Sequence, residues 1–177
     1  MWIDRITELE PGKRLVAIKN VTLAEEHLHD HFPAQVGPDG EPLDPLPVMP
    51  ACFLIEGMAQ TAGILVGHAG GFKEKVILAK VPKAELTGDV FPGMTVRYEA
   101  TIERLDPAGA STIGIVSVRD HTPDWRQIGT IEIFFSHVDQ NMAGLEFPEE
   151  NFVFGDNFKA LLAASNIPEL NDAAAGR

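Results

Sequence analysis

The sequence is poor in cysteine and in long apolar runs. Cys52 is the one cysteine among 177 residues. A lone thiol cannot form a disulfide within the chain, so we expect no disulfide framework and a reducing compartment, the cytoplasm. The most apolar stretch, residues 51–67, contains Glu56 and Gln60 and is short for a membrane span. The first fourteen residues have no basic segment followed by an apolar one, so we expect no secretory leader.

Basic residues are also scarce. The chain has 14 Lys and Arg against 26 Asp and Glu, a net charge of -12, and such a chain repels the phosphates of nucleic acids. An acidic protein partner would be repelled as well, unless a local basic patch received it. Such a run occurs at Lys73, Lys75, Lys80 and Lys83. The simpler interpretation of this run is a solvated strand edge.

Alternation of apolar and polar residues predicts about six strands. Pro-Gly, Asp-Pro-Ala-Gly and His-Thr-Pro-Asp turns join several of them, which indicates an antiparallel sheet. Pro82 suggests an edge strand or a bulge in the third strand. The alternating segments are residues 2–9, 14–23, 75–86, 94–105, 110–120 and 126–138.

One segment, residues 51–67, has the pattern of a helix. Pro50 suits the first helical position, and Gly67 with the glycines after it supplies a stop. The segment is apolar nearly all round, so we expect burial on most sides. Gly57 and Gly63 fit a helix that strands approach closely. A long helix inside a curved antiparallel sheet is the hot-dog arrangement, an α+β fold.

Glu56 is the only charged residue of this helix. A carboxylic acid enclosed by apolar groups stays protonated near neutral pH, which is what a general acid requires. Gln60, one turn later, has the spacing to orient the carboxyl by a hydrogen bond. An equally open interpretation places Glu56 on a narrow solvated stripe or in a structural ion pair.

The start of the helix is a second candidate element. The free amides of its first turn, those of Ala51 and Cys52 included, point out of the N-terminus and can stabilise negative charge on a carbonyl oxygen. Alone, this feature is only a buried helix start. The thiol of Cys52 is better explained as a small buried residue than as a nucleophile.

Three histidines alternate in "EEHLHDHFP". His27, His29 and His31 share one face if the segment is a strand, so the alternatives are a metal site, a pH-sensitive strand edge, or one functional histidine with two bystanders.

The motifs "HFP" at residues 31–33 and "VMPACFLIEGMAQTAGIL" at residues 48–65 resemble the signature of the β-hydroxyacyl-acyl-carrier-protein dehydratases. The likeness extends over about residues 2–138. It implies a catalytic histidine at His31, a catalytic carboxylate at Glu56 and a supporting glutamine at Gln60. It further implies a thioester carbonyl at the amides of Ala51 and Cys52, after Pro50.

The resemblance implies dehydration of 3-hydroxyacyl thioesters to trans-2-enoyl thioesters in fatty acid or related lipid biosynthesis. It implies a homodimer with shared active sites, possibly a trimer of dimers, with acyl carrier protein or coenzyme A carrying the substrate. The lysine run 73–83 is then a candidate docking surface for an acidic carrier. No cofactor, metal, nucleic acid or membrane is expected, and His27 and His29 become bystanders.

Two rival functions stay open: a hot-dog acyl thioesterase in which Glu56 activates water, and a non-catalytic acyl-thioester-binding paralogue. Two departures from the family pattern are present. Residues 34–47 form an inserted loop, and Ala51 replaces a glycine. We expect a hot-dog domain over residues 1–140 and an extension over 141–177, with a short helix within 155–166 and a frayed tail.

Overall fold

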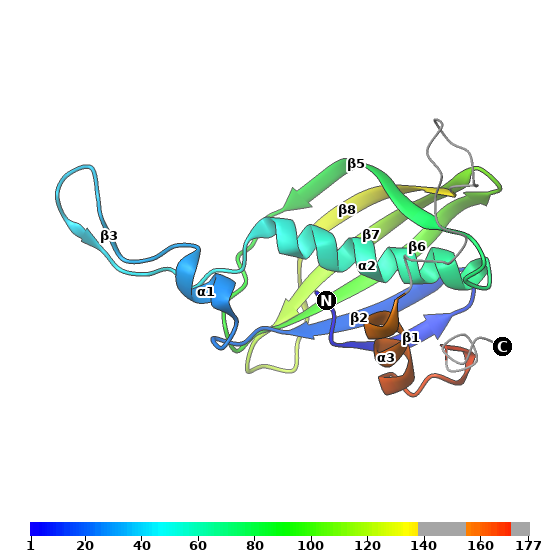
Figure 1. Cartoon of the computed structure of the whole chain (residues 1–177). Helices are drawn as coiled ribbons and strands as arrows, with labels where there is room; N and C mark the ends of the chain where they lie inside the picture. Colours follow the sequence, from blue (N-terminus) through cyan, green and yellow to red (C-terminus); the bar gives the residue numbers. More distant parts are fainter. Residues whose placement is uncertain (138–154, 171–177) are drawn as a thin grey trace.

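The computed structural model describes residues 1–137 and 155–170. Figure 1 shows a curved sheet that wraps one long helix, with a hairpin projecting from one end of the molecule. The elements are β1 (Arg5–Glu10), β2 (Arg14–Asn20), α1 (Glu26–Asp30), β3 (Gln35–Val36), β4 (Pro42–Leu43), α2 (Ala51–Ala69), β5 (Val76–Leu86), β6 (Thr95–Asp106), β7 (Gly109–Arg119), β8 (Arg126–His137) and α3 (Asp156–Ala164).

The main sheet has the strand order β1-β2-β6-β7-β8-β5, and each neighbouring pair is antiparallel. The six alternating segments of the sequence supply its strands, which confirms the predicted hot-dog fold. On β6 the buried positions are Val96, Tyr98 and Ala100, as the alternation predicts. β5 lies at one edge, and its register shifts between Lys80 and Lys83, around Pro82.

The helix α2 differs at both ends from its prediction. Pro50 is not the first helical residue but the cap before it, with ψ 136°, because its extended backbone lets the helix begin at Ala51. The helix continues two residues beyond Gly67. It ends where the N–H of Gly70 bonds to the carbonyl of Val66 and Gly71 turns the chain with φ +63°.

One face of α2 forms the core against β2, β5, β6, β7 and β8. Leu54, Met58 and Leu65 are buried there. Gly57 allows the closest approach, since a Cβ at this position would lie 2.4 Å from Cζ of Tyr98. The predicted close approach of a strand to a helix glycine is thereby confirmed at Gly57.

The opposite face of α2 is open in the single chain. Ala51, Cys52 and Glu56 are exposed, and Gln60 and Gly63 are partly exposed. The prediction of burial on most sides is confirmed from Gly57 to Gly67, where all residues except Gln60 and Gly63 are buried, and it fails only along a stripe of the N-terminal half of the helix. This face is the outer boundary of the candidate site.

The C-terminal extension packs onto the β1 edge (Figure 1). The helix α3 lies within the stretch predicted to be helical. Ser165, which follows α3, accepts a hydrogen bond from the N–H of Ile6 (3.1 Å), and Leu161 and Leu162 are buried. The predicted frayed tail at 171–177 and residues 138–154 lie outside the described residues. Within the described part of the chain, none of the helices has the length and apolar content needed to cross a bilayer.

Candidate active site

A cleft of about 570 Å³ opens at the N-terminal end of α2. Two of the predicted site elements meet in it: the imidazole of His31 and the first turn of α2 with Ala51 and Cys52. The lining residues are His31, Phe32, Val48, Met49, Pro50, Ala51, Cys52, Leu54, Leu86, Thr87, Gly88 and Asp89.

His31 is placed by α1. The histidine run forms a short helix and not a strand, so a shared strand face for its three imidazoles is ruled out. Leu28 is buried and anchors this helix to the body, and His31 follows as its C-cap. The imidazole packs edge-on against Phe32, 4.4 Å between ring centroids. His31 is exposed and faces the cleft.

The other two histidines point to different surroundings. His27 packs edge-on against Phe53 (4.8 Å) and Trp2 (5.1 Å), and these two rings are stacked 3.8 Å apart. His27 therefore helps to hold α1 against α2, a structural contact that the sequence analysis missed. His29 contacts the carbonyl oxygen of Leu23 through Nε2. Over residues 1–137 and 155–170, no three His, Cys, Asp or Glu side chains gather as a metal site would need.

The first turn of α2 is fixed from the side of the sheet. The N–H of Met49 donates to the carbonyl of Val90 (2.8 Å), which holds the chain just before the helix. The amides of Ala51 and Cys52 lack helical partners, as in every first turn, and both residues line the cleft. Position 51 is ordinary helix without positive φ, so the methyl group of Ala51 causes no backbone strain. The expectation that Cys52 is buried is wrong: its side chain is exposed.

Glu56 does not line this cleft. It is exposed in the single chain, so the predicted apolar enclosure is absent there. It lies one turn beyond Cys52 on the same helix face, about 6 Å along the axis. The cleft and the carboxyl group of Glu56 are thus neighbours on one surface of the molecule, and Asp89 is the one acidic residue among those that line the cleft with His31.

The carboxyl of Glu56 is nevertheless oriented. Gln60 donates to it from Nε2 (2.9 Å), which is the hydrogen bond expected from the i, i+4 spacing. The Oε1 atom of Gln60 accepts the backbone N–H of Trp2 (2.9 Å). This second bond fixes which end of the amide faces Glu56. Sequence reasoning missed Trp2, because a backbone N–H that meets a side chain 58 positions away leaves no motif.

The lysine run does not form the patch that the sequence suggested. Lys75 is 7% exposed, so its assignment to a docking surface is wrong. Lys80 lies over the ring of Phe134, and Lys83 pairs with Glu85 at 3.0 Å. Lys83 carries a raised pKa, chiefly from its hydrogen bond to that carboxylate. A run along an extended strand spreads its charges over about 3.3 Å per residue, and none of these lysines lines the cleft.

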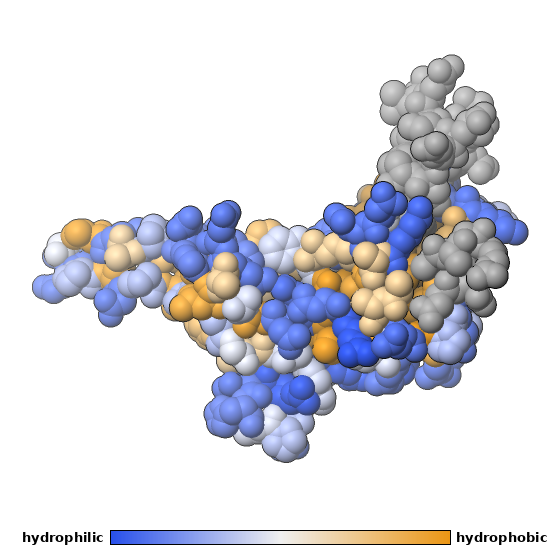
Figure 2. Space-filling model, turned by 60° about the horizontal axis from the view of Figure 1, so that its bottom comes forward, coloured by the Kyte–Doolittle hydropathy of each residue, from blue (hydrophilic) through white to orange (hydrophobic). Residues whose placement is uncertain are grey.

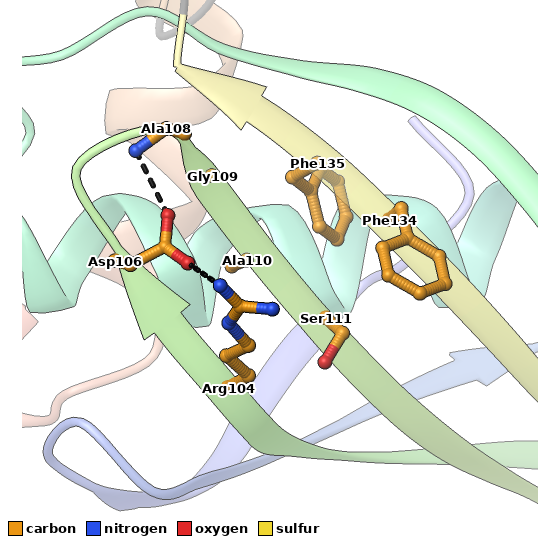
Figure 3. Close-up of a pocket in the computed structure, with 8 residues that line it drawn as sticks. All are labelled: Arg104, Asp106, Ala108, Gly109, Ala110, Ser111, Phe134 and Phe135. Atoms are coloured by element: carbon orange, nitrogen blue, oxygen red, sulfur yellow. Dashed lines mark hydrogen bonds and ion pairs between the residues drawn. The ribbon is translucent and has the colours of Figure 1, made fainter.

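A smaller hollow lies at the opposite end of the sheet, by the β6–β7 turn (Figure 3). Its charged side chains form their hydrogen bond and ion pair within the β6–β7 turn. Asp106 accepts the N–H of Ala108 (2.9 Å) and pairs with Arg104 (2.7 Å), and the backbone hydrogen bond lowers the pKa of this carboxyl first of all. This hollow offers no histidine, so the cleft with His31 remains the better candidate.

The geometry combines an imidazole with free helix amides around an open cleft, a pairing suited to proton transfer next to a carbonyl group. A model of the FabA-like domain family matches residues 1–124. The chain belongs to the FabA-like domain family.

Curated relatives of this FabA-like chain include two proteins named 3-hydroxyacyl-acyl-carrier-protein dehydratase FabZ. The one from Clostridium tetani is 34% identical over 121 residues, which cover 68% of this chain and 78% of the relative. The one from Solibacter usitatus is 37% identical over 120 residues, which cover 67% of each. The family match over residues 1–124 contains the first hairpin, the histidine motif and α2.

Solved structures support the fold of this FabA-like chain at low sequence identity. The dehydratase heterocomplex ApeI:P from Xenorhabdus doucetiae matches with TM-score 0.56 and 16% identity, over 79% of this chain and 84% of that chain. An acyl-CoA hydrolase from Staphylococcus aureus in complex with butyryl coenzyme A matches with TM-score 0.54 and 13% identity, over 71% and 66%.

Proposed function

We propose that this chain dehydrates 3-hydroxyacyl thioesters to trans-2-enoyl thioesters in fatty acid or related lipid biosynthesis. The observation that carries the proposal is the cleft, because it gathers His31 and the first turn of α2 in a chain of the FabA-like family. The curated relatives carry the dehydratase name, and this activity needs the groups that the cleft supplies.

Each group has one task in the reaction. The imidazole of His31 removes the proton from Cα of the substrate, and that electron pair forms the new Cα–Cβ double bond. The C–O bond at Cβ breaks, and the hydroxyl leaves as water with a proton from Glu56. Charge that builds on the thioester carbonyl is held by the amides of Ala51 and Cys52. Proton exchange with solvent restores His31 and Glu56.

The placement of Glu56 supports the proposal of a homodimer with shared sites. In one chain this carboxyl is exposed and outside the cleft. Among the residues that line the cleft with His31, Asp89 is the one acidic residue. A second copy docked on the open face of α2 would bring its Glu56 to His31 and enclose both groups. Enclosure by the partner, and not by the chain itself, would supply the water-poor surroundings that a general acid requires.

The substrate carrier has a better docking surface than the lysine run. Arg119 lies over the exposed ring of Trp125 (4.7 Å), and Arg97 lies at 6.0 Å from the same ring. A Cβ on Gly88, which lines the cleft, would lie 3.1 Å from Nη1 of Arg126. Arg97 pairs with Glu99 (2.6 Å), whereas Arg119 and Arg126 form no ion pair with a carboxylate within the described residues. Arg119 and Arg126 therefore form a small basic patch, and Arg126 is the member that lies beside the cleft. An acidic carrier protein fits this patch.

The compartment is part of the same proposal. Cys52 is the one cysteine and its thiol is exposed, which suits the reducing cytoplasm.

The direct test is hydration of a crotonyl thioester, followed by loss of enoyl absorbance. His31→Ala and Glu56→Gln should each lower kcat by at least about a hundredfold. Unchanged turnover in both variants contradicts the assigned roles. Release of free thiol without loss of enoyl absorbance would support a thioesterase instead.

Mixing the two variants tests the shared site. In a twofold-symmetric dimer that exchanges subunits, one site of each mixed dimer is intact, so an equal mixture should regain about a quarter of the wild-type activity. Sites complete within one chain would regain nothing on mixing.

A further inference from the structure

Residues 34–47, called the arm here, leave the body between His31 and α2. β3 and β4 form a two-stranded sheet of their own within the arm, separate from the main sheet. Figure 1 shows the arm projecting beyond the N-terminal end of α2, roughly along the direction of that helix. The arm closes at its base, where the N–H of Leu46 donates to the carbonyl of Phe32 (3.0 Å).

The arm has little internal support. β3 and β4 pair over two residues each, and the turn adds the bonds from Gly37 to Glu41 and from Gly40 to Gly37. An isolated hairpin of this size is marginally stable in water. The four prolines of the arm restrict its unfolded states but add no packing. A hairpin that projects from the body in this way needs a surface to lie on.

The arm is also apolar where it is exposed. Val36 is 72% exposed, Leu43 46% and Leu46 50%. At its root, an apolar cleft of about 650 Å³ continues this surface to the body, lined by Leu23, Ala24, Leu28, His29, Pro45 and Pro47. Figure 2 shows apolar residues exposed along the arm, at the left. The register pairs Val36 with Pro42 and Gln35 with Leu43, so Val36 and Leu43 lie on opposite faces of the hairpin and each face exposes an aliphatic side chain. Large exposed apolar side chains on both faces of a projecting hairpin favour an interface there.

We propose that the arm packs against a second copy of this chain, an inference that rests on the shared site proposed above. The proposed shared site requires the partner's helix to approach the N-terminal end of α2, so that the partner's carboxyl group reaches His31. The arm starts next to His31 and projects beyond that same end, so it runs toward the partner. Its exposed aliphatic side chains then cover the partner and strengthen the dimer.

Charge argues against two other occupants. The arm carries Asp39, Glu41 and Asp44 and has no Lys or Arg. An acidic carrier protein and an anionic lipid surface would both be repelled by these carboxylates. A second copy is acidic as well, with a net charge of -12, so charge does not select it. It is favoured by position, because the shared site proposed above places a second copy at the end of α2 from which the arm projects.

The first experiment measures the dimer dissociation constant by sedimentation. The double variant V36D/L43D should raise this constant at least tenfold, because it puts a carboxylate on each face of the hairpin, so that whichever face contacts the partner loses an aliphatic side chain. The control D39N/E41Q changes the turn of the arm without adding charge and should leave the constant within about threefold of wild type. A dissociation constant unchanged by V36D/L43D, or a wild-type chain that stays monomeric, overturns the inference.

The second experiment needs no destabilising variant. A benzophenone amino acid replaces Val36, and a mixture of ¹⁴N- and ¹⁵N-labelled chains is irradiated. Mixed-isotope cross-linked peptides support the inference, and cross-links within one chain only overturn it. Turnover of the wild type is measured separately. If the wild type has no turnover but cross-links between copies form, the proposed function alone is refuted. If the wild type turns over the thioester but no cross-links between copies form, the arm contact alone is refuted.

Discussion

Gln60 offers the sharpest test of the site within one chain. Its amide connects the N–H of Trp2 to the carboxyl of Glu56 through two hydrogen bonds of 2.9 Å. The variant Gln60→Met keeps the length and volume of the side chain and removes both bonds. Glu56 then loses the donor that fixes its rotamer, and its carboxyl group spends less time in the orientation from which it donates a proton.

The expected effect follows from the bond that is lost. A hydrogen bond to a neutral carboxyl group contributes about 1 kcal/mol, which corresponds to roughly a fivefold lower kcat if the whole orientation effect acts in the transition state. KM should change little, because Gln60 does not line the cleft that receives the thioester. Steady-state kinetics of crotonyl thioester hydration separate the two constants.

A matched control is Asn20→Leu, which removes another surface amide that accepts a hydrogen bond, from Thr95 (3.1 Å), away from α2. It should leave kcat unchanged. If Gln60→Met keeps kcat within about threefold of wild type while the protein stays folded, then orientation by this amide contributes under 1 kcal/mol and the reasoning is wrong.

Two further predictions concern stability. Gly57→Ala should destabilise the fold by about 1–3 kcal/mol despite the better helix propensity of alanine, because the new Cβ would lie 2.4 Å from the rigid ring of Tyr98. Gly63→Ala, whose Cβ would lie 3.6 Å from the nearest ring atom, should stabilise the fold by up to about 1 kcal/mol. Urea unfolding measures both changes, and equal effects would contradict the close approach at Gly57. Glu99 has a lowered pKa, chiefly from its hydrogen bond to Arg14. Its contribution to the free energy of unfolding is therefore present above the pKa of the unfolded chain, near 4.5, and disappears as the pH falls through the folded pKa. Glu99→Gln should therefore cost about 1 kcal/mol at pH 7 and progressively less as the pH falls below 4.5, and a cost that does not fall with pH would refute the assignment.

The strands were predictable because each is half-buried. On β6 the alternation in the sequence matches the burial of Val96, Tyr98 and Ala100 against α2. The short helix α1 was not predictable in the same way. Its five residues contain a single buried anchor, Leu28, so no helical period is visible, and three alternating histidines imitate a strand.

The catalytic roles of the site residues stay a prediction, and the surroundings of these residues could not be read from the sequence. A motif specifies that His31 and Glu56 are present, but burial depends on which bodies are assembled. The run 73–83 shows the same limit within one chain, because a sequence cannot tell that Lys75 turns inward while Lys80 stays exposed. The bond from Trp2 to Gln60 depends on tertiary packing alone.

The composition of α2 is explained only by two layers of cover. Its own sheet buries Leu54, Met58 and Leu65, which would satisfy an amphipathic helix with a polar outer face. The outer face instead presents Ala51, Cys52 and a partly exposed Gly63, with Glu56 as its single charge. Small and apolar residues on an exposed helix face lose nothing when another body covers them, whereas a charge there must find a role or a partner. The lack of polar residues on this face therefore fits the second copy proposed above, which would cover it.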